Sequence, residues 1–121
     1  MRRNGSGWVV AIAVALSSAL VAQSATSAAE TAATTLLRES QTLWHKKQFD
    51  DALAKLARVQ DEYGHTAAAT DAGLWTSRVL TALGDPVAGL EELQQVRARW
   101  PKSAAAIAAL AQSSVLRRLY V

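Results

Sequence analysis

The chain has 121 residues, half of them hydrophobic, with 13 Lys and Arg, 10 Asp and Glu, and no Cys. This length suits one small domain, and the lack of cysteine excludes disulfide bonds, thiolate metal sites and the lipid anchor of bacterial lipoproteins. The charge balance argues against a nucleic-acid binder, because setting aside the two arginines near the amino terminus leaves 11 basic against 10 acidic residues.

The first 29 residues follow the order of a secretory signal peptide. Arg2 and Arg3 give a positive start, a weakly polar run covers Trp8–Ala22, and small residues follow as far as Ala29. This run is shorter than the roughly 20 residues that a spanning helix needs, so cleavage is favoured over an uncleaved inner-membrane anchor. We expect general secretion rather than the twin-arginine route, with cleavage after Ala28 or, preferably, Ala29.

The remaining chain, residues 30–121, is predicted to be a periplasmic or secreted helical domain without strands. Apolar side chains recur every three or four residues over Glu30–Lys46 and again from Lys47 to Gly64, where glycine is a suitable stop. The short link between these two helices predicts that they pack antiparallel.

A second helix pair is expected after Gly64. The hydroxyl of Thr66 is expected to cap a helix that ends at Gly84. Asp85 followed by Pro86 predicts a new start, because aspartate caps free amides and proline suits the first helical turn. A proline at position 101 ends this helix.

Ser103 is then expected to cap a fifth helix, interpreted as a solvating cap at the end of the stack. One face of this helix is predicted to be apolar: Ile107, Leu110, Ala111, Val115 and Leu119.

Five basic residues near the carboxyl end have no acidic residue among or after them: Arg97, Arg99, Lys102, Arg117 and Arg118. The favoured interpretation is a solvated helical end, where cations also suit the helix dipole. The alternative is a docking patch for an acidic partner or for anionic lipid headgroups.

The two helix pairs are copies of one unit, offset by 37 residues. The offset pairs Ser40 with Ser77, Leu43 with Leu80, Ala52 with Gly89, Leu53 with Leu90, Leu56 with Leu93, Val59 with Val96, and Tyr63 with Trp100. Repeats of this length indicate stacked supersecondary units. A third copy fails, because Leu80 would map to Arg117.

These residues resemble a tetratricopeptide repeat, with small residues at the close helix contacts, an interhelical glycine at Gly84 and a terminal proline at Pro101. The unit is similar to repeats of bacterial envelope proteins, including the Tol-Pal-associated cell-division coordinator and the outer-membrane assembly lipoproteins. It departs from the family at Lys47, where a glycine belongs, at Gly64, where a proline belongs, and at Pro86, where an aromatic residue is usual. The resemblance implies an all-α stack of two repeats plus a carboxyl-terminal capping helix.

The resemblance also implies a function as an exported adaptor or scaffold that binds a protein or peptide in the cell envelope. The partner would lie in a concave face formed by the first helix of each unit. Positions that correspond to this groove are Leu37, Gln41, Trp44, His45, Leu74 and Arg78. For Trp44, packing in the core and anchoring a partner have equal weight, since a large aromatic residue serves either purpose.

Catalytic chemistry has little support in the sequence. His45 and His65 are the only histidines, and the adjacent acids Asp50–Asp51 and Glu91–Glu92 point in different directions around a helix. We therefore expect no enzyme, no cofactor and no metal site. The alternative is a small all-helical envelope enzyme, which a cavity holding a histidine beside two acids would favour.

A small, alanine-rich core without disulfides is expected to gain burial by association. Leu36 and Leu37 have no preceding repeat to cover them, so self-association through the outer face of the first helix is predicted. Membrane contact is expected only if the signal segment stays uncleaved.

Overall fold

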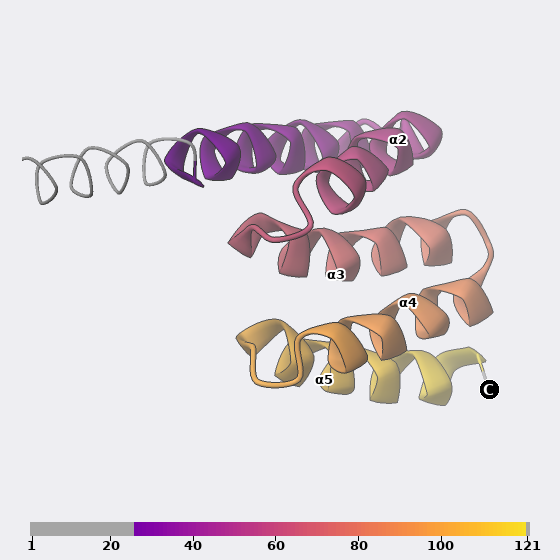
Figure 1. The fold of residues 1–121 in the computed structure, drawn as a ribbon. Helices are drawn as coiled ribbons and strands as arrows, with labels where there is room; N and C mark the ends of the chain where they lie inside the picture. Colours follow the sequence, from indigo (N-terminus) through magenta and orange to yellow (C-terminus); the bar gives the residue numbers. More distant parts are fainter. Residues whose placement is uncertain (1–25, 121) are drawn as a thin grey trace, which may run out of the picture.

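The computed structural model describes residues 26–120, and within them the chain forms five helices and no strand (Figure 1). The all-α prediction is therefore confirmed. The helices cover residues 26–45 (the first helix), α2 Phe49–Glu62, α3 Ala67–Ala82, α4 Pro86–Arg99 and α5 Ala104–Tyr120. Most of the predicted signal peptide lies outside the described residues. Within residues 26–120, no helix is both long enough and apolar enough to span a bilayer.

The first helix differs from the prediction at its start. It is already helical at Thr26, ahead of the expected beginning at Glu30. The intervening residues are Ser27, Ala28 and Ala29, among which alanine is the best helix former. The hydroxyl of Thr31 donates to the carbonyl of Ser27 at 3.0 Å, within the same continuous helix. Nothing in this stretch interrupts the backbone pattern.

Consecutive helices run back and forth in a single stack, as Figure 1 shows for α3, α4 and α5. Each helix packs on the next one in the chain: α2 on α3, α3 on α4 and α4 on α5. A smaller contact joins α3 to α5, two helices apart. Alternate helices therefore come together as well as sequential ones, which matters for the groove described below.

The 37-residue repeat is present in the backbone. The bounds of α4 lie 37 residues after those of α2, and α5 begins 37 residues after α3. Both interhelical elbows place one residue in the left-handed region, Lys47 with φ 61° and Gly84 with φ 91°. In each elbow the amide after that residue donates to the carbonyl five residues back, at 2.9 Å. Lys47 thus adopts the backbone conformation that glycine adopts in the second copy.

Two of the three predicted helix caps are confirmed. A carboxylate oxygen of Asp85 accepts a hydrogen bond from the amide of Ala88 at 3.0 Å. The hydroxyl oxygen of Ser103 accepts one from the amide of Ala106 at 3.1 Å. Both side chains satisfy a donor that the first helical turn leaves free.

The predicted cap at Thr66 is wrong. Its hydroxyl instead donates to the carbonyl of Tyr63 at 2.6 Å, and makes no cap to α3. The amide of Ala67 donates to the Glu30 carboxylate at 2.9 Å, so a side chain of the first helix reaches the start of α3. A carboxylate also suits the positive end of the helix dipole. The contact is non-local, which is why the local pattern did not reveal it.

The core has two parts. The larger cluster joins the first helix, α2 and α3, and contains Leu36, Leu37, Leu56, Val59 and Val79. The smaller cluster joins α4 and α5. Leu36 and Leu37 are only 7% and 8% exposed, so the prediction that they form an uncovered outer face is wrong. The reason is that the first helix turns these leucines toward α2 and α3, rather than toward its free side.

Small residues bring α3 and α4 close together. A Cβ atom on Gly73 would lie 2.3 Å from Cγ2 of Val96, and one on Gly89 would lie 2.8 Å from Oγ1 of Thr81. Ser77, which the sequence placed at this contact, is 1% exposed. The spacing of the second helix pair therefore depends on positions without a side chain.

The packing face of α5 was predicted wrongly. The residues that it buries are Ala105, Ala106, Ala109 and Ser113. Ile107 and Leu119, expected on the apolar packing face, are 74% and 67% exposed. The buried alanines of α5 lie 37 residues after the buried alanines of α3. Helix α5 therefore contacts α4 through the side that corresponds to the one with which α3 contacts α2. Its outer side is apolar and basic, unlike a solvating cap.

Candidate functional site: a groove between alternate helices

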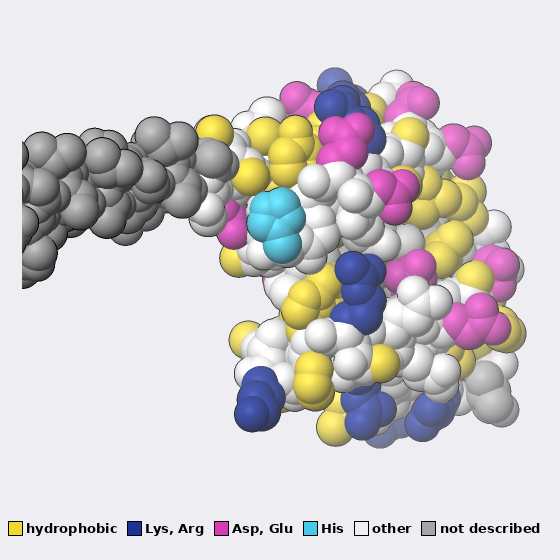
Figure 2. All heavy atoms as spheres, viewed as in Figure 1, with side chains coloured by type: hydrophobic (Ala, Val, Ile, Leu, Met, Phe, Trp, Pro, Cys, Tyr) yellow, Lys and Arg dark blue, Asp and Glu magenta, His cyan; other side chains and the backbone are white. Residues whose placement is uncertain are grey.

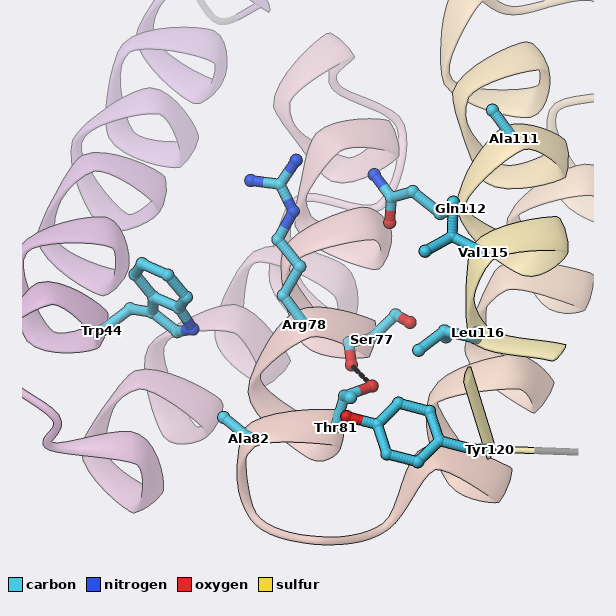
Figure 3. Close-up of a pocket in the computed structure, with 10 residues that line it drawn as sticks. All are labelled: Trp44, Ser77, Arg78, Thr81, Ala82, Ala111, Gln112, Val115, Leu116 and Tyr120. Atoms are coloured by element: carbon cyan, nitrogen blue, oxygen red, sulfur yellow. Dashed lines mark hydrogen bonds between the residues drawn. The ribbon is translucent and has the colours of Figure 1, made fainter. Parts of the chain in front are cut away.

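A cavity of about 470 Å³ opens between the first helix, α3 and α5 (Figure 3). Its lining residues are Trp44 from the first helix, Ser77, Arg78, Thr81 and Ala82 from α3, and Ala111, Gln112, Val115, Leu116 and Tyr120 from α5. No residue of α2 or α4 lines it. The groove is thus made by alternate helices of the stack, and α5 supplies one whole wall.

Trp44 forms the wall on the side of the first helix. Its ring meets Trp75 edge to face, with ring centroids 5.6 Å apart, and meets His45 similarly at 5.2 Å. The indole packs against the larger core cluster while it also lines the groove. The side chain of Trp44 therefore packs in the core and also lines the groove.

The indole nitrogen of Trp44 is a buried donor without a hydrogen-bond partner among the described residues. Buried donors are satisfied in most folded proteins, and Trp N–H groups usually find a partner. Figure 3 shows this nitrogen on the side of the ring that faces α3 and the cavity.

Arg78 rises from the floor formed by α3. Its guanidinium carbon lies 4.7 Å from the centroid of the Trp75 ring, a cation–π contact that holds the exposed side chain in place. No Asp or Glu is among the lining residues, and no salt bridge involves Arg78 within residues 26–120. The groove therefore offers a cation without a counter-ion.

The α5 wall combines apolar and polar groups. Val115 and Tyr120 are 52% and 56% exposed, Leu116 is half-buried, and the amide of Gln112 extends toward Arg78 in Figure 3. Sequence reasoning missed this wall because it interpreted α5 as a solvating cap. The available signal was the alanine triplet at the start of α3 and α5, which recurs at the 37-residue offset.

Of the six residues predicted to line a groove, the structure places Trp44 and Arg78 on this cavity. The other four do not line it. Leu37 is buried in the larger core cluster, and Leu74 packs half-buried against the smaller one. Gln41 is half-buried and His45 is exposed beside Trp44.

Comparison with known proteins does not assign this chain to a family. No protein-family model, curated protein or solved structure matches this chain. The function is therefore inferred from the residues of the groove and from their chemistry.

The groove holds no constellation for acid–base or metal chemistry. Neither His45 nor His65 lines it, and no acidic residue does. Across the described part of the chain, no three His, Cys, Asp or Glu side chains gather as a metal site. Among residues 26–120, the carboxyl with a clear shift is that of Glu92 on α4, where burial raises the pKa despite a hydrogen bond with Gln60 and the nearby charge of Arg99. It lies outside the groove lining.

Proposed function

We propose that this protein is a non-catalytic binding module, a tetratricopeptide-type adaptor whose groove holds a segment of a protein partner. The observation that supports this proposal is the groove itself, which alternate helices of a 37-residue repeat line with apolar side chains and a few polar groups. Its volume lies in the range of clefts that hold small ligands or several side chains. Half-exposed aromatic residues at both walls are typical binding anchors.

The proposed partner is a peptide segment rather than a nucleic acid. The lining contains one cation, Arg78, and large apolar side chains, whereas nucleic-acid surfaces carry many cations. We expect the segment to place an aliphatic or aromatic side chain between Trp44 and Val115. Its backbone carbonyls would accept hydrogen bonds from groups such as Gln112.

The proposed site of action is the cell envelope, after export. This part of the proposal rests on the amino-terminal sequence: two arginines, an apolar run and small residues up to Ala29. Cleavage after Ala29 would leave Glu30 in place to contact the start of α3. Sequencing the amino terminus of the exported protein tests this step, and we expect it to begin near Glu30. An intact Met1 in a membrane fraction would contradict it.

The binding proposal is tested by selecting peptides from a random display library on the immobilised protein. We expect enriched sequences with a shared apolar residue, and at least a tenfold loss of affinity for Val115→Glu. The matched control is Val87→Glu on α4, since Val87 is 60% exposed and lies outside the groove. Equal binding by both variants would overturn the proposal, as would the absence of any enriched sequence.

Trp44 gives a second, less selective test. Because its ring packs with Trp75 as well as lining the groove, Trp44→Ala is expected to lower both affinity and stability. Truncation of a buried tryptophan costs about 3–5 kcal/mol, and the half-buried Trp44 should lose less. Urea unfolding of the variant separates this loss from the loss of binding.

A further inference from the structure

Ile107 on α5 is the most exposed large hydrophobic side chain among the described residues. We define the outer face of α5 by five residues on the same side of the helix as Ile107, none of which lines the groove or is buried against α4: Ile107, Leu110, Ser114, Arg117 and Arg118. Ile107 is 74% exposed and Leu110 is 49% exposed. Helical spacing places these residues on one side, with the arginines at the carboxyl end of the helix.

Basic side chains border this face. Arg97, Arg99 and Lys102 are exposed at the end of α4 and in the turn before α5. No salt bridge within residues 26–120 involves any of the three, although Arg99 lies over the Trp100 ring and beside Gly64, on the side of α2 and α3 rather than on this face. No acidic residue follows Glu92 in the sequence. On the face shown in Figure 2, Lys and Arg line the lower end, while Asp and Glu lie above it.

A second copy of this chain is a poor match for the outer face of α5. Two such faces in contact would bring like charges together without an acidic residue to pair them. The opposite end of the stack does not match either, because the surface of the first helix around Thr31, Thr34 and Thr35 is polar. Continuation of the repeat also fails, since Arg117 takes the position of the half-buried Leu43 and Leu80.

We propose that the outer face of α5 binds the surface of an anionic lipid bilayer. Exposed aliphatic side chains enter the boundary between headgroups and acyl chains, and the cations Arg97, Lys102, Arg117 and Arg118 contact the headgroups. A basic residue near an anionic membrane surface raises the partition coefficient about fivefold, and long basic side chains reach headgroups while their stems stay apolar. This surface is separate from the groove, so the proposal stands without the binding of a peptide.

The experiment measures binding of the full chain to vesicles of phosphatidylcholine alone, and to vesicles that contain 30% phosphatidylglycerol, by flotation. The difference between the two compositions removes the apolar contribution of the amino-terminal run, and the comparison between variants removes the charge of Arg2 and Arg3, which all variants retain. We expect the wild type to bind anionic vesicles at least tenfold better than neutral ones. Arg117→Glu with Arg118→Glu should reduce anionic binding at least about twentyfold, because it removes two fivefold contributions.

Two comparisons complete the test. The control Arg38→Glu with Lys46→Glu makes the same change of charge at exposed positions far along the chain, and should retain most of the binding. Ile107→Ser with Leu110→Ser should weaken binding while leaving the circular dichroism unchanged. Equal binding of both vesicle types would overturn the proposal. A lipid-free dimer by light scattering, dissociated by Ile107→Ser, would instead assign this face to a second copy.

Discussion

The two copies of the repeat have equivalent helix bounds and elbow conformations, but different residues fill equivalent packing positions. Leu36 in the first copy is 7% exposed in the core and corresponds to Gly73 in the second copy, where a Cβ atom would clash with Val96. Ala52 corresponds to Gly89, and Lys47 to Gly84. The second copy therefore places glycine at three positions where the first has a side chain. The difference teaches that the repeat fixes helix ends and elbows, while the distance between paired helices is adjustable.

The largest expected effect on stability comes from substitutions at the equivalent positions Leu36 and Gly73. Leu36→Ala should lower the free energy of unfolding by about 2–4 kcal/mol, because it leaves a cavity in the larger core cluster. Gly73→Ala should cost about 1–3 kcal/mol by overpacking, since its Cβ would lie 2.3 Å from Val96. Urea denaturation measures both. A stabilised Gly73→Ala variant would show that α3 and α4 can move apart at little cost, and would contradict the need for glycine at this position of the second copy.

A smaller effect is expected at the close contact between Gly89 and Thr81. Gly89→Ala should lower stability by about 1 kcal/mol, because the clash outweighs the better helix propensity of alanine. The double variant with Thr81→Ala removes the nearest atom and should recover part of the loss. Ala52 shows that the first copy already holds a methyl group there, 0% exposed. Thermal unfolding of the three variants provides the measurement, and full additivity would contradict a direct clash.

The elbows should respond with opposite signs. Gly84→Ala is expected to cost about 1 kcal/mol, because φ is 91° and no neighbour lies within 4 Å to compensate or clash. Lys47→Gly is expected to gain up to about 1 kcal/mol by relieving a non-glycine residue at φ 61°. Chemical denaturation curves with equal slopes would allow direct comparison. Loss of stability in Lys47→Gly would mean that the side chain, rather than the backbone, decides this elbow.

The non-local cap of α3 gives a further contrast with the local cap of α5. Glu30→Ala should destabilise the protein by about 0.5–1 kcal/mol, because it removes the carboxylate that accepts from the Ala67 amide. Ser103→Ala should cost a similar amount, about 1 kcal/mol, through the amide of Ala106. Unfolding at two salt concentrations distinguishes them, since the carboxylate contact is the more easily screened. A salt-independent Glu30 effect would argue against the dipole contribution.

The smallest effect concerns charge at another pair of equivalent positions. Lys55 pairs with Glu39 at 2.8 Å, whereas its counterpart Glu92 is partly buried and its pKa is raised above 4.5 by burial. The pKa of the Glu92 carboxyl is higher in the folded than in the unfolded protein, so its ionised form is less compatible with folding than its protonated form. The free energy of unfolding therefore falls as the pH rises through the folded pKa. Glu92→Gln should therefore raise the melting temperature at neutral pH, and the gain should vanish below pH 4.5.

The control for this prediction is Glu91→Gln, which removes the same charge from the exposed neighbour. A general effect of net charge would appear in both variants, while a burial effect would appear only in Glu92→Gln. Melting curves recorded over the acid range provide the measurement. A gain that persists at low pH would assign the effect to packing rather than to ionisation.

Sequence reasoning predicted the features that single residues determine. The ends of α2 and α3 follow from Gly64 and Gly84, and the starts of α4 and α5 follow from Asp85, Pro86 and Ser103. It failed where the outcome depends on a distant partner. Thr66 lost its cap to the carboxylate of Glu30, and the α5 wall of the groove depends on which side of that helix meets α4.

The choice of faces was the hardest part. Leucine usually marks a packing face, but the sequence alone predicts an uncovered face at Leu36 and Leu37, because no repeat unit precedes them. For α5, the same rule selected Ile107 and Leu119, yet the helix packs through alanine. Alanine contributes little transfer free energy but permits close helix contact, and hydrophobic periodicity gives it little weight.

The small residues through which α5 packs on α4 affect how readily this helix opens. Three of the four residues that α5 buries are alanines and the fourth is Ser113, so α5 itself contributes little apolar surface to its contact with Leu93 and Val96 of α4. Partial opening that exposes little apolar surface has a low free energy relative to global unfolding. Amides of α5 should thus exchange with solvent sooner than those of α3, whose neighbours hold it on both sides. A bulky segment could then enter the groove when α5 moves away from α3, so the width of the groove would be variable rather than fixed.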